Sequence, residues 1–138
     1  MKIILDTNVF VSALRSNAGT SRQLLRVIFD GQVKCVTSTA LWMEYEDLIH
    51  RPIWGDLTTL AQREIVLDAL ASHSEWVNLY FNWQPNLRDE GDNFLIELAI
   101  AGNAKAIVTH NIKDLTSGEL IFPNLSIVTP DVFLEQLT

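Results

Sequence analysis

The fold is decided by the first eight residues, Met1-Lys2-Ile3-Ile4-Leu5-Asp6-Thr7-Asn8. Ile3, Ile4 and Leu5 are consecutive apolar β-formers without alternation, so they predict a short strand buried on both faces, as in a parallel sheet. Asp6 follows at the carboxyl end of this strand, where open α/β sheets bind their ligands. A carboxylate there indicates a metal ion or a proton-transfer role, although a lone Asp more often caps the helix that follows.

The size and composition of the chain predict one globular domain over residues 1–138. The sequence is 48% hydrophobic and 20% charged, and a chain of this length buries a sufficient core without disulfides. Its single cysteine, Cys35, is expected to be a small core residue, which suits a reducing cytoplasm. We expect no secretory leader and no membrane-spanning segment.

The chain is acidic, with a formal net charge of -7. This charge argues against a protein that holds nucleic acid by bulk electrostatics, because such proteins are usually basic. It does not exclude nucleic acid as a substrate, since carboxylates that bind divalent cations change the local sign of the charge. The acidity therefore reflects solubility alone, or else part of it serves as metal ligands.

Strands and helices alternate along the sequence, which predicts a mainly parallel sheet with helices on both faces. Further strands are expected at 33–36, 76–80, 106–109 and 125–128. Helices are expected at 8–15, from Ser21 as the cap to 29, from Ser38 or Thr39 as the cap to 49, at 57–72, at 92–101, and from Pro130 onward. Caps and proline fit these starts because they satisfy or lack the free amides of a first helical turn.

Acidic and amide side chains gather at strand and helix ends that meet at one edge of such a sheet. They are Asp6, Glu44, Asp92, Asn111 and Asp114. Carboxylates brought together there would repel one another unless they were protonated or bridged by cations. Oxygen ligands of this kind suit Mg²⁺ or Mn²⁺. Taken singly, each residue has an ordinary explanation as a cap or a solvated side chain, but their convergence favours a metal site.

Two of these positions have close competitors in the sequence. Spacing alone does not choose Glu44 over Glu46 or Asp47, because the three lie on one predicted helix. Asp89 and Asp92 also fit an acidic helix start, which the helix dipole favours. The residue pattern therefore leaves the identity of these ligands open.

The same residues belong to five segments of the sequence. The segments are Ile4-Leu5-Asp6-Thr7-Asn8, Glu44-Tyr45 with Arg51-Pro52, Asp89-Glu90-Gly91-Asp92-Asn93 leading into Phe94-Leu95-Ile96-Glu97-Leu98-Ala99, Ile107-Val108-Thr109-His110-Asn111-Ile112-Lys113-Asp114-Leu115, and Ile127-Val128-Thr129-Pro130-Asp131-Val132-Phe133-Leu134. In this order and spacing the chain resembles the PIN-domain family, especially its bacterial members that act as toxins of toxin–antitoxin systems. The resemblance covers almost the whole chain.

The resemblance implies a three-layer α/β/α fold with a five-stranded sheet ordered 3-2-1-4-5, and a metal-dependent ribonuclease. The family's acidic quartet carries over to Asp6, Glu44, Asp92 and Asp114, as catalytic residues and as ligands of Mg²⁺ or Mn²⁺. The residues expected to contact substrate or to orient the ligands are Thr7, Asn8, Asp89, Thr109 and Asn111. Many relatives carry an Asp at the position of Asn111, so either Asn111 or Asp114 completes the site.

The partners implied by the resemblance are an RNA substrate and an antitoxin protein. A dimer is also expected, because two predicted helices carry apolar side chains that could pair two copies. These are Leu24, Val27, Ile28, Phe29, Leu41, Trp42 and Tyr45. Ordinary packing on the sheet explains most of these positions equally well.

Three other interpretations share part of the pattern. A haloacid-dehalogenase-like phosphatase needs a second Asp two positions after the first, where this chain has Asn8. A receiver domain would open on an acidic pair rather than on a single acid. A PIN fold that has lost activity and only binds would fit Asn111, but Asp6, Glu44 and Asp92 argue against it.

Overall fold

A five-stranded parallel sheet organises the protein. The computed structural model describes residues 1–16, 19–78, 90–112 and 124–137, with the backbone alone for 90–93. The strands are Lys2–Leu5 (β1), Lys34–Thr37 (β2), Ser74–Trp76 (β3), Ala106–Val108 (β4) and Ser126–Val128 (β5). Their order is β3-β2-β1-β4-β5 and every pairing is parallel, which confirms the predicted order. The direction of winding therefore reverses between β1 and β4.

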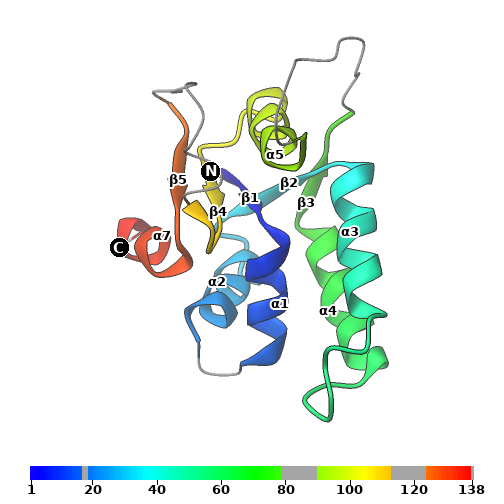
Figure 1. The fold of residues 1–138 in the computed structure, drawn as a ribbon. Coiled ribbons are helices and arrows are strands. Elements are labelled where there is room, and N and C mark those ends of the chain that lie inside the picture. Colours follow the sequence, from blue (N-terminus) through cyan, green and yellow to red (C-terminus); the bar gives the residue numbers. More distant parts are fainter. Residues whose placement is uncertain (17–18, 79–89, 113–123, 138) are drawn as a thin grey trace.

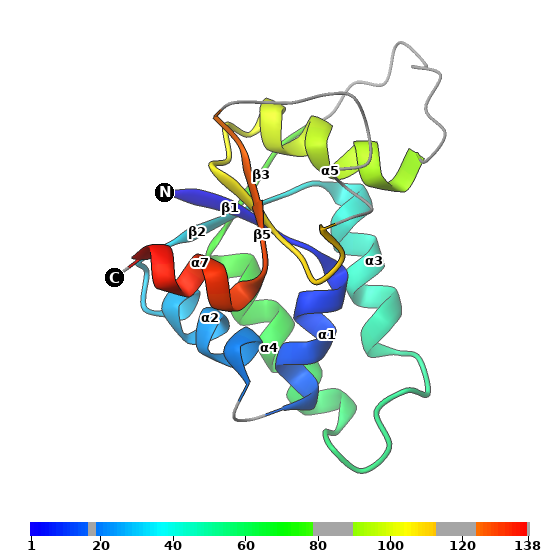
Figure 2. The same ribbon diagram turned by 60° about the vertical axis from the view of Figure 1, so that its left-hand side comes forward.

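Helices cover both faces of this sheet. They are Thr7–Arg15 (α1), Thr20–Phe29 (α2), Thr39–Ile49 (α3), Leu60–Ser72 (α4), Glu90–Ala101 (α5) and Pro130–Leu137 (α7). One face carries α5, and the other carries α1, α2, α4 and α7 (Figures 1 and 2). The three layers expected from the sequence are thus present. Within the parts of the chain that the structure describes, we find no helix both long and apolar enough to cross a bilayer.

The core sits on either side of the central strand. Ile3, Ile4 and Leu5 are at most 1% exposed, as expected for a strand covered on both faces. Cys35 on β2 is also buried. Of the side chains considered for a dimer, Leu24, Ile28, Leu41 and Tyr45 are buried in this core, and Val27, Phe29 and Trp42 pack partly against it. Ordinary packing therefore accounts for that apolar surface.

Four expected helix starts differ from the structure. Helices α1 and α5 begin slightly earlier than expected, at Thr7 and Glu90. Helix α2 begins at Thr20 after Gly19, so Ser21 is not its cap but a buried residue of its first turn. Helix α4 begins at Leu60 rather than at 57, because the Thr59 hydroxyl and the Gln62 side chain cap each other's backbone amides. This reciprocal capping satisfies amides that a longer helix would leave free.

The edge strand β3 begins and ends earlier in the sequence than the strand expected at 76–80. Its position is set by pairing with β2, in which Cys35 lies opposite Ser74 and Thr37 lies opposite Trp76. The expected residues 79 and 80 lie outside the described residues. Strand β3 therefore ends level with the carboxyl end of β2, at the same edge of the sheet as Asp6.

Candidate active site

The carboxyl ends of β1 and β4 lie side by side where the winding reverses. Leu5 is opposite Val108 in the parallel register, and the backbone amide of Asp6 donates to the Val108 carbonyl at 3.0 Å. Asp6 and Thr109 are thus the first residues beyond two neighbouring strands. Open α/β sheets bind their ligands outside the strand ends at a reversal of this kind.

The two carboxylate oxygens of Asp6 accept hydrogen bonds from different groups. Oδ1 accepts the backbone amide of Thr7 at 2.7 Å and so caps α1. Oδ2 accepts the hydroxyl of Thr109 at 2.7 Å and the side-chain amide of Asn8 at 3.3 Å. The capping interpretation of Asp6 is correct for one oxygen, while the other is turned towards the end of β4.

Hydrogen bonds from Asn8 and Thr109 connect the residues after β4 to the carboxylate of Asp6. The side-chain carbonyl of Asn8 accepts the backbone amide of His110 at 3.1 Å, and its amide also lies 3.4 Å from the Thr109 hydroxyl. Thr109 is fully buried, and its hydroxyl accepts the backbone amide of Asn111 at 3.0 Å. Asn8 donates and accepts at the same time, which an ionised carboxylate cannot do. This use of Asn8 does not fit the proton-transferring Asp of a dehalogenase-like phosphatase.

Glu44 is the acid of α3 that interacts with Asp6. Partial burial and the nearby carboxylate of Asp6 raise the pKa of Glu44 above its ordinary value. By contrast, Asp47, further along α3, forms an ion pair with Arg51, which lies just beyond the helix. The sequence could not distinguish these acids, and the electrostatics of the folded chain single out Glu44 as the one coupled to Asp6.

The remaining predicted ligands are only partly placed. Asp92 belongs to the first turn of α5, and this turn lies near the start of α3 (Figures 1 and 2). Its side chain, like Asp89 and Asp114, lies outside the described residues. Among the side chains that are described, no group of three or more His, Cys, Asp and Glu is gathered as a metal site.

The two acids that are placed suit a hard divalent cation. Asp6 and Glu44 offer oxygen donors alone, and burial together with repulsion from Asp6 raises the pKa of Glu44. A doubly charged ion between them would relieve this repulsion. Oxygen-only donor sets are typical of Mg²⁺ and Mn²⁺.

Sequence reasoning missed two residues that shape this edge. The hydroxyl of buried Ser21 lies 3.2 Å from Nε2 of His110 and links α2 to the end of β4. The hydroxyl of Tyr45 donates to the Leu5 carbonyl, directly before Asp6. No sequence pattern indicates the contact of Ser21, whereas the position of Tyr45 beside Glu44 could have drawn attention to it.

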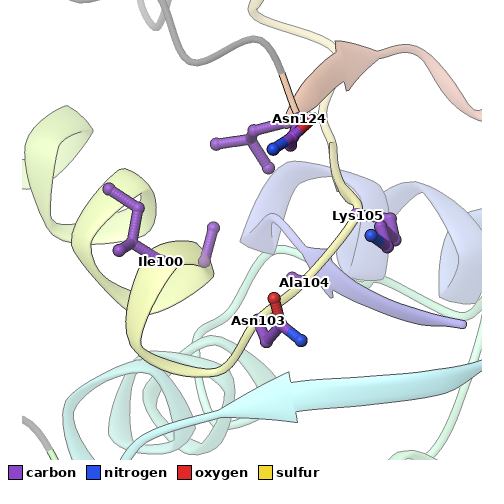
Figure 3. A pocket seen from close by; sticks show the side chains of 7 residues that line it. Ile100, Asn103, Ala104, Lys105 and Asn124 are labelled. Atoms are coloured by element: carbon purple, nitrogen blue, oxygen red, sulfur yellow. The ribbon is translucent and has the colours of Figure 1, made fainter.

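A separate hollow of about 240 Å³ lies at the opposite edge of the sheet (Figure 3). It lies where α5 ends and where β4 and β5 begin. Its lining is formed by Ala99, Ile100, Asn103, Ala104, Lys105, Asn124 and Leu125. None of these side chains is acidic, so the hollow is distinct in place and chemistry from the carboxylates at Asp6.

Known proteins resemble this chain in sequence and in fold. The sequence profile of the PIN domain family matches residues 2–113. The uncharacterized protein MJ1680 of Methanocaldococcus jannaschii is 31% identical over 144 aligned residues, which cover 99% of this chain and 91% of that protein. A chain in the crystal structure of VapBC2 from Rickettsia felis bound to a DNA fragment from its promoter has a similar fold, with a TM-score of 0.60 and 20% sequence identity. The matched region covers 92% of this chain and 97% of that chain. The last similarity concerns the fold.

Proposed function

This chain belongs to the PIN domain family, a family of nucleases, and on that premise we propose that it is a divalent-metal-dependent endoribonuclease. The observation that carries the proposal is the carboxylate of Asp6. Thr109 and Asn8 hold it by hydrogen bonds at the reversal of the sheet, next to the acid Glu44. The substrate would be RNA, and the reaction would be hydrolysis of a phosphodiester bond.

Four acids would hold the cation, which we take to be Mg²⁺ or Mn²⁺. They are Asp6, Glu44, Asp92 and Asp114, with Asn111 as the alternative to Asp114. Such an ion would lower the pKa of a bound water and stabilise the negative charge that develops on the phosphate. Asp89 stays a further candidate near the start of α5.

The protein's own residues would direct the attack. Glu44 would accept the proton of the attacking water, because a carboxylate of raised pKa is a better base than an ordinary one. The water oxygen then bonds to phosphorus, and the bond to the leaving ribose oxygen breaks. Thr7 and Asn8 stand at the start of α1, where the helix dipole favours a phosphate group.

We also propose the partners that the family resemblance implies. The chain would act as the toxin of a toxin–antitoxin pair, with an antitoxin that covers the acidic edge, and its fold shared with VapBC2 supports this. Exposed apolar side chains such as Met43 (62%) and Ile65 (68%) offer surface for an antitoxin or for a second copy in a dimer. The single buried thiol of Cys35 suits the cytoplasm.

The test is a cleavage assay on single-stranded RNA with Mg²⁺, with Mn²⁺ and with EDTA. Asp6→Asn and Asp92→Asn should each abolish metal-dependent cleavage. Asp47→Asn is the matched control, because that acid pairs with Arg51. Cleavage that survives both active-site changes would refute the proposed site. RNA binding without cleavage would indicate an inactive binding module, and hydrolysis of small phosphomonoesters would restore the phosphatase alternative.

A further inference from the structure

An exposed tryptophan with an aromatic support stands at the edge of the sheet that carries Asp6. Trp76 is the last residue of β3 and is 44% exposed. The ring of Trp42, on α3, lies beside it with ring centroids 4.9 Å apart and planes inclined at 52°. Trp42 in turn meets the buried ring of Tyr45 edge-on at 5.5 Å. The indole of Trp76 is therefore backed by a series of rings that reaches into the core.

The backbone of this tryptophan is fixed in a row with the residue before Asp6. Thr37 pairs with Trp76, and the amide of Val77 donates to the Thr37 carbonyl at 2.8 Å. Strand β1 pairs with β2 through Ile3 opposite Cys35, which brings Leu5 level with Thr37. The backbones of Leu5 and Trp76 are thus two strand spacings apart, about 10 Å. Trp76 therefore ends its strand at the same edge of the sheet as Asp6.

The chemistry of this position favours a nucleobase. An indole that is partly exposed and held from behind presents a flat apolar surface, and unpaired bases stack on such surfaces whatever their identity. The chain has a net charge of -7, so attraction to the phosphate backbone contributes little, and stacking has to supply more of the affinity. From this geometry we infer that Trp76, supported by Trp42, is a stacking platform for an unpaired base close to the scissile phosphate. The inference rests on the proposed function and adds the residues that would hold an unpaired base of the substrate.

The experiment measures binding separately from cleavage. A short dye-labelled oligoadenylate is titrated with the full chain in EDTA, with fluorescence anisotropy as the readout. Trp76→Ala should weaken binding about fivefold or more, and Trp76→Phe, which keeps an aromatic surface, should restore most of the affinity. Leu57→Ala, which removes an exposed apolar side chain just before α4, should leave the affinity unchanged. Affinity for double-stranded RNA should not depend on Trp76, because its bases are already stacked.

Cleavage kinetics and solution mass complete the test. With Mg²⁺ present, Trp76→Ala should raise KM in proportion to the lost affinity while kcat changes little. Wild-type binding that is absent, or that is equal in Trp76→Ala, overturns the inference. The same holds if Trp76→Ala disrupts a dimer while oligoadenylate affinity stays constant, because the surface then belongs to a second copy. Trp76-dependent binding without any cleavage would instead contradict the nuclease proposal and leave the stacking platform standing.

Discussion

The hydroxyl of Tyr45 donates a hydrogen bond to the backbone carbonyl of Leu5, so that helix α3 is tied to the central strand. Each partner is the immediate neighbour of an acid, Glu44 on the helix and Asp6 after the strand. Burial, followed by the nearby Cys35, Asp6 and Glu44, raises the pKa of Tyr45 well above its ordinary value. The phenol therefore stays protonated and keeps donating, and the bond holds the backbones of the two acids together.

Replacing Tyr45 by Phe removes this bond and keeps the ring, which also contacts Phe10 at 5.0 Å. We expect the free energy of unfolding in urea to fall by about 1 kcal/mol. Mn²⁺ affinity, measured by isothermal titration calorimetry, should weaken because Glu44 is no longer held against Asp6. Phe10→Leu is the control, since it loses ring packing but keeps the hydroxyl. Equal Mn²⁺ affinity in Tyr45→Phe and the wild type would show that the bond is only structural.

Thr109 can be tested with two substitutions of similar size. Thr109→Val removes the hydroxyl that donates to Asp6 and accepts the amide of Asn111, whereas Thr109→Ser keeps it. Because the site is fully buried, Val should lower the free energy of unfolding by about 1–3 kcal/mol. It should also reduce metal-dependent RNA cleavage at least about tenfold. Ser should retain most of both properties, and a fully active Thr109→Val would rule out a role in holding Asp6.

The parts of the fold that the sequence predicted are those set by local patterns. The apolar run from Ile3 to Leu5 can only be buried, and the acid that follows it must then stand at the end of a central strand. Ser38 caps α3 and Asn103, with a φ of 57°, follows the end of α5, as their residue types favour. Such features need no knowledge of distant segments.

The parts that the sequence could not predict depend on contacts between distant segments. The register of β3 follows from its pairing with β2, and its own residues would equally have allowed a later strand. Ser21 contacts His110, which lies 89 positions later in the sequence. The sequence suggested only that Ser21 caps a helix and gave no sign of this contact. Glu44 could be chosen over Asp47 as the acid near Asp6 only from its surroundings in the folded chain, because both are ordinary helical acids in the sequence.

Divalent cations should stabilise the folded chain against heat. At a concentration about 100 times its dissociation constant, a cation that binds only the folded state adds about 2.7 kcal/mol to the free energy of unfolding. We expect Mn²⁺ to raise the Tm by several degrees in differential scanning fluorimetry, and EDTA to reverse the shift. Glu44→Gln removes a repelling charge beside Asp6, so its Tm in EDTA should rise while its response to Mn²⁺ shrinks. An undiminished response in both Glu44→Gln and Asp6→Asn would place the cation elsewhere.

Gly102 is expected to resist substitution for a steric reason. A Cβ at this position would lie 2.4 Å from Cγ1 of Val36 on β2 and 3.2 Å from the Leu98 carbonyl. Val36 is short, branched and buried, so it cannot move aside cheaply. Gly102→Ala should therefore lower the free energy of unfolding by about 1–3 kcal/mol.

The double variant of Gly102→Ala with Val36→Ala separates crowding from other causes. If the clash with Val36 is responsible, the loss in the double variant should be smaller than the sum of the single losses by about 0.5–3 kcal/mol. Urea unfolding of the four chains gives this coupling directly. Additive losses would mean that Gly102 matters for its backbone alone.

Stability should decline in alkaline solution because of Cys35. Burial raises the pKa of this thiol from 9.0 to about 12, so between these values the folded chain keeps a proton that the unfolded chain has released. The unfolded state then binds fewer protons, and the free energy of unfolding falls as the pH rises, by about 1.4 kcal/mol per pH unit. The contribution is fully present below about pH 9. Urea unfolding measured at several pH values between about 8 and 10.5 should show this fall. Tyr45 adds to it only at the upper end of the range, because an unfolded phenol titrates near pH 10.

Cys35→Ala is the control, because alanine cannot ionise. Its free energy of unfolding should start lower but depend less on pH. The same pH dependence in the wild type and in Cys35→Ala would show that the buried thiol is not the cause.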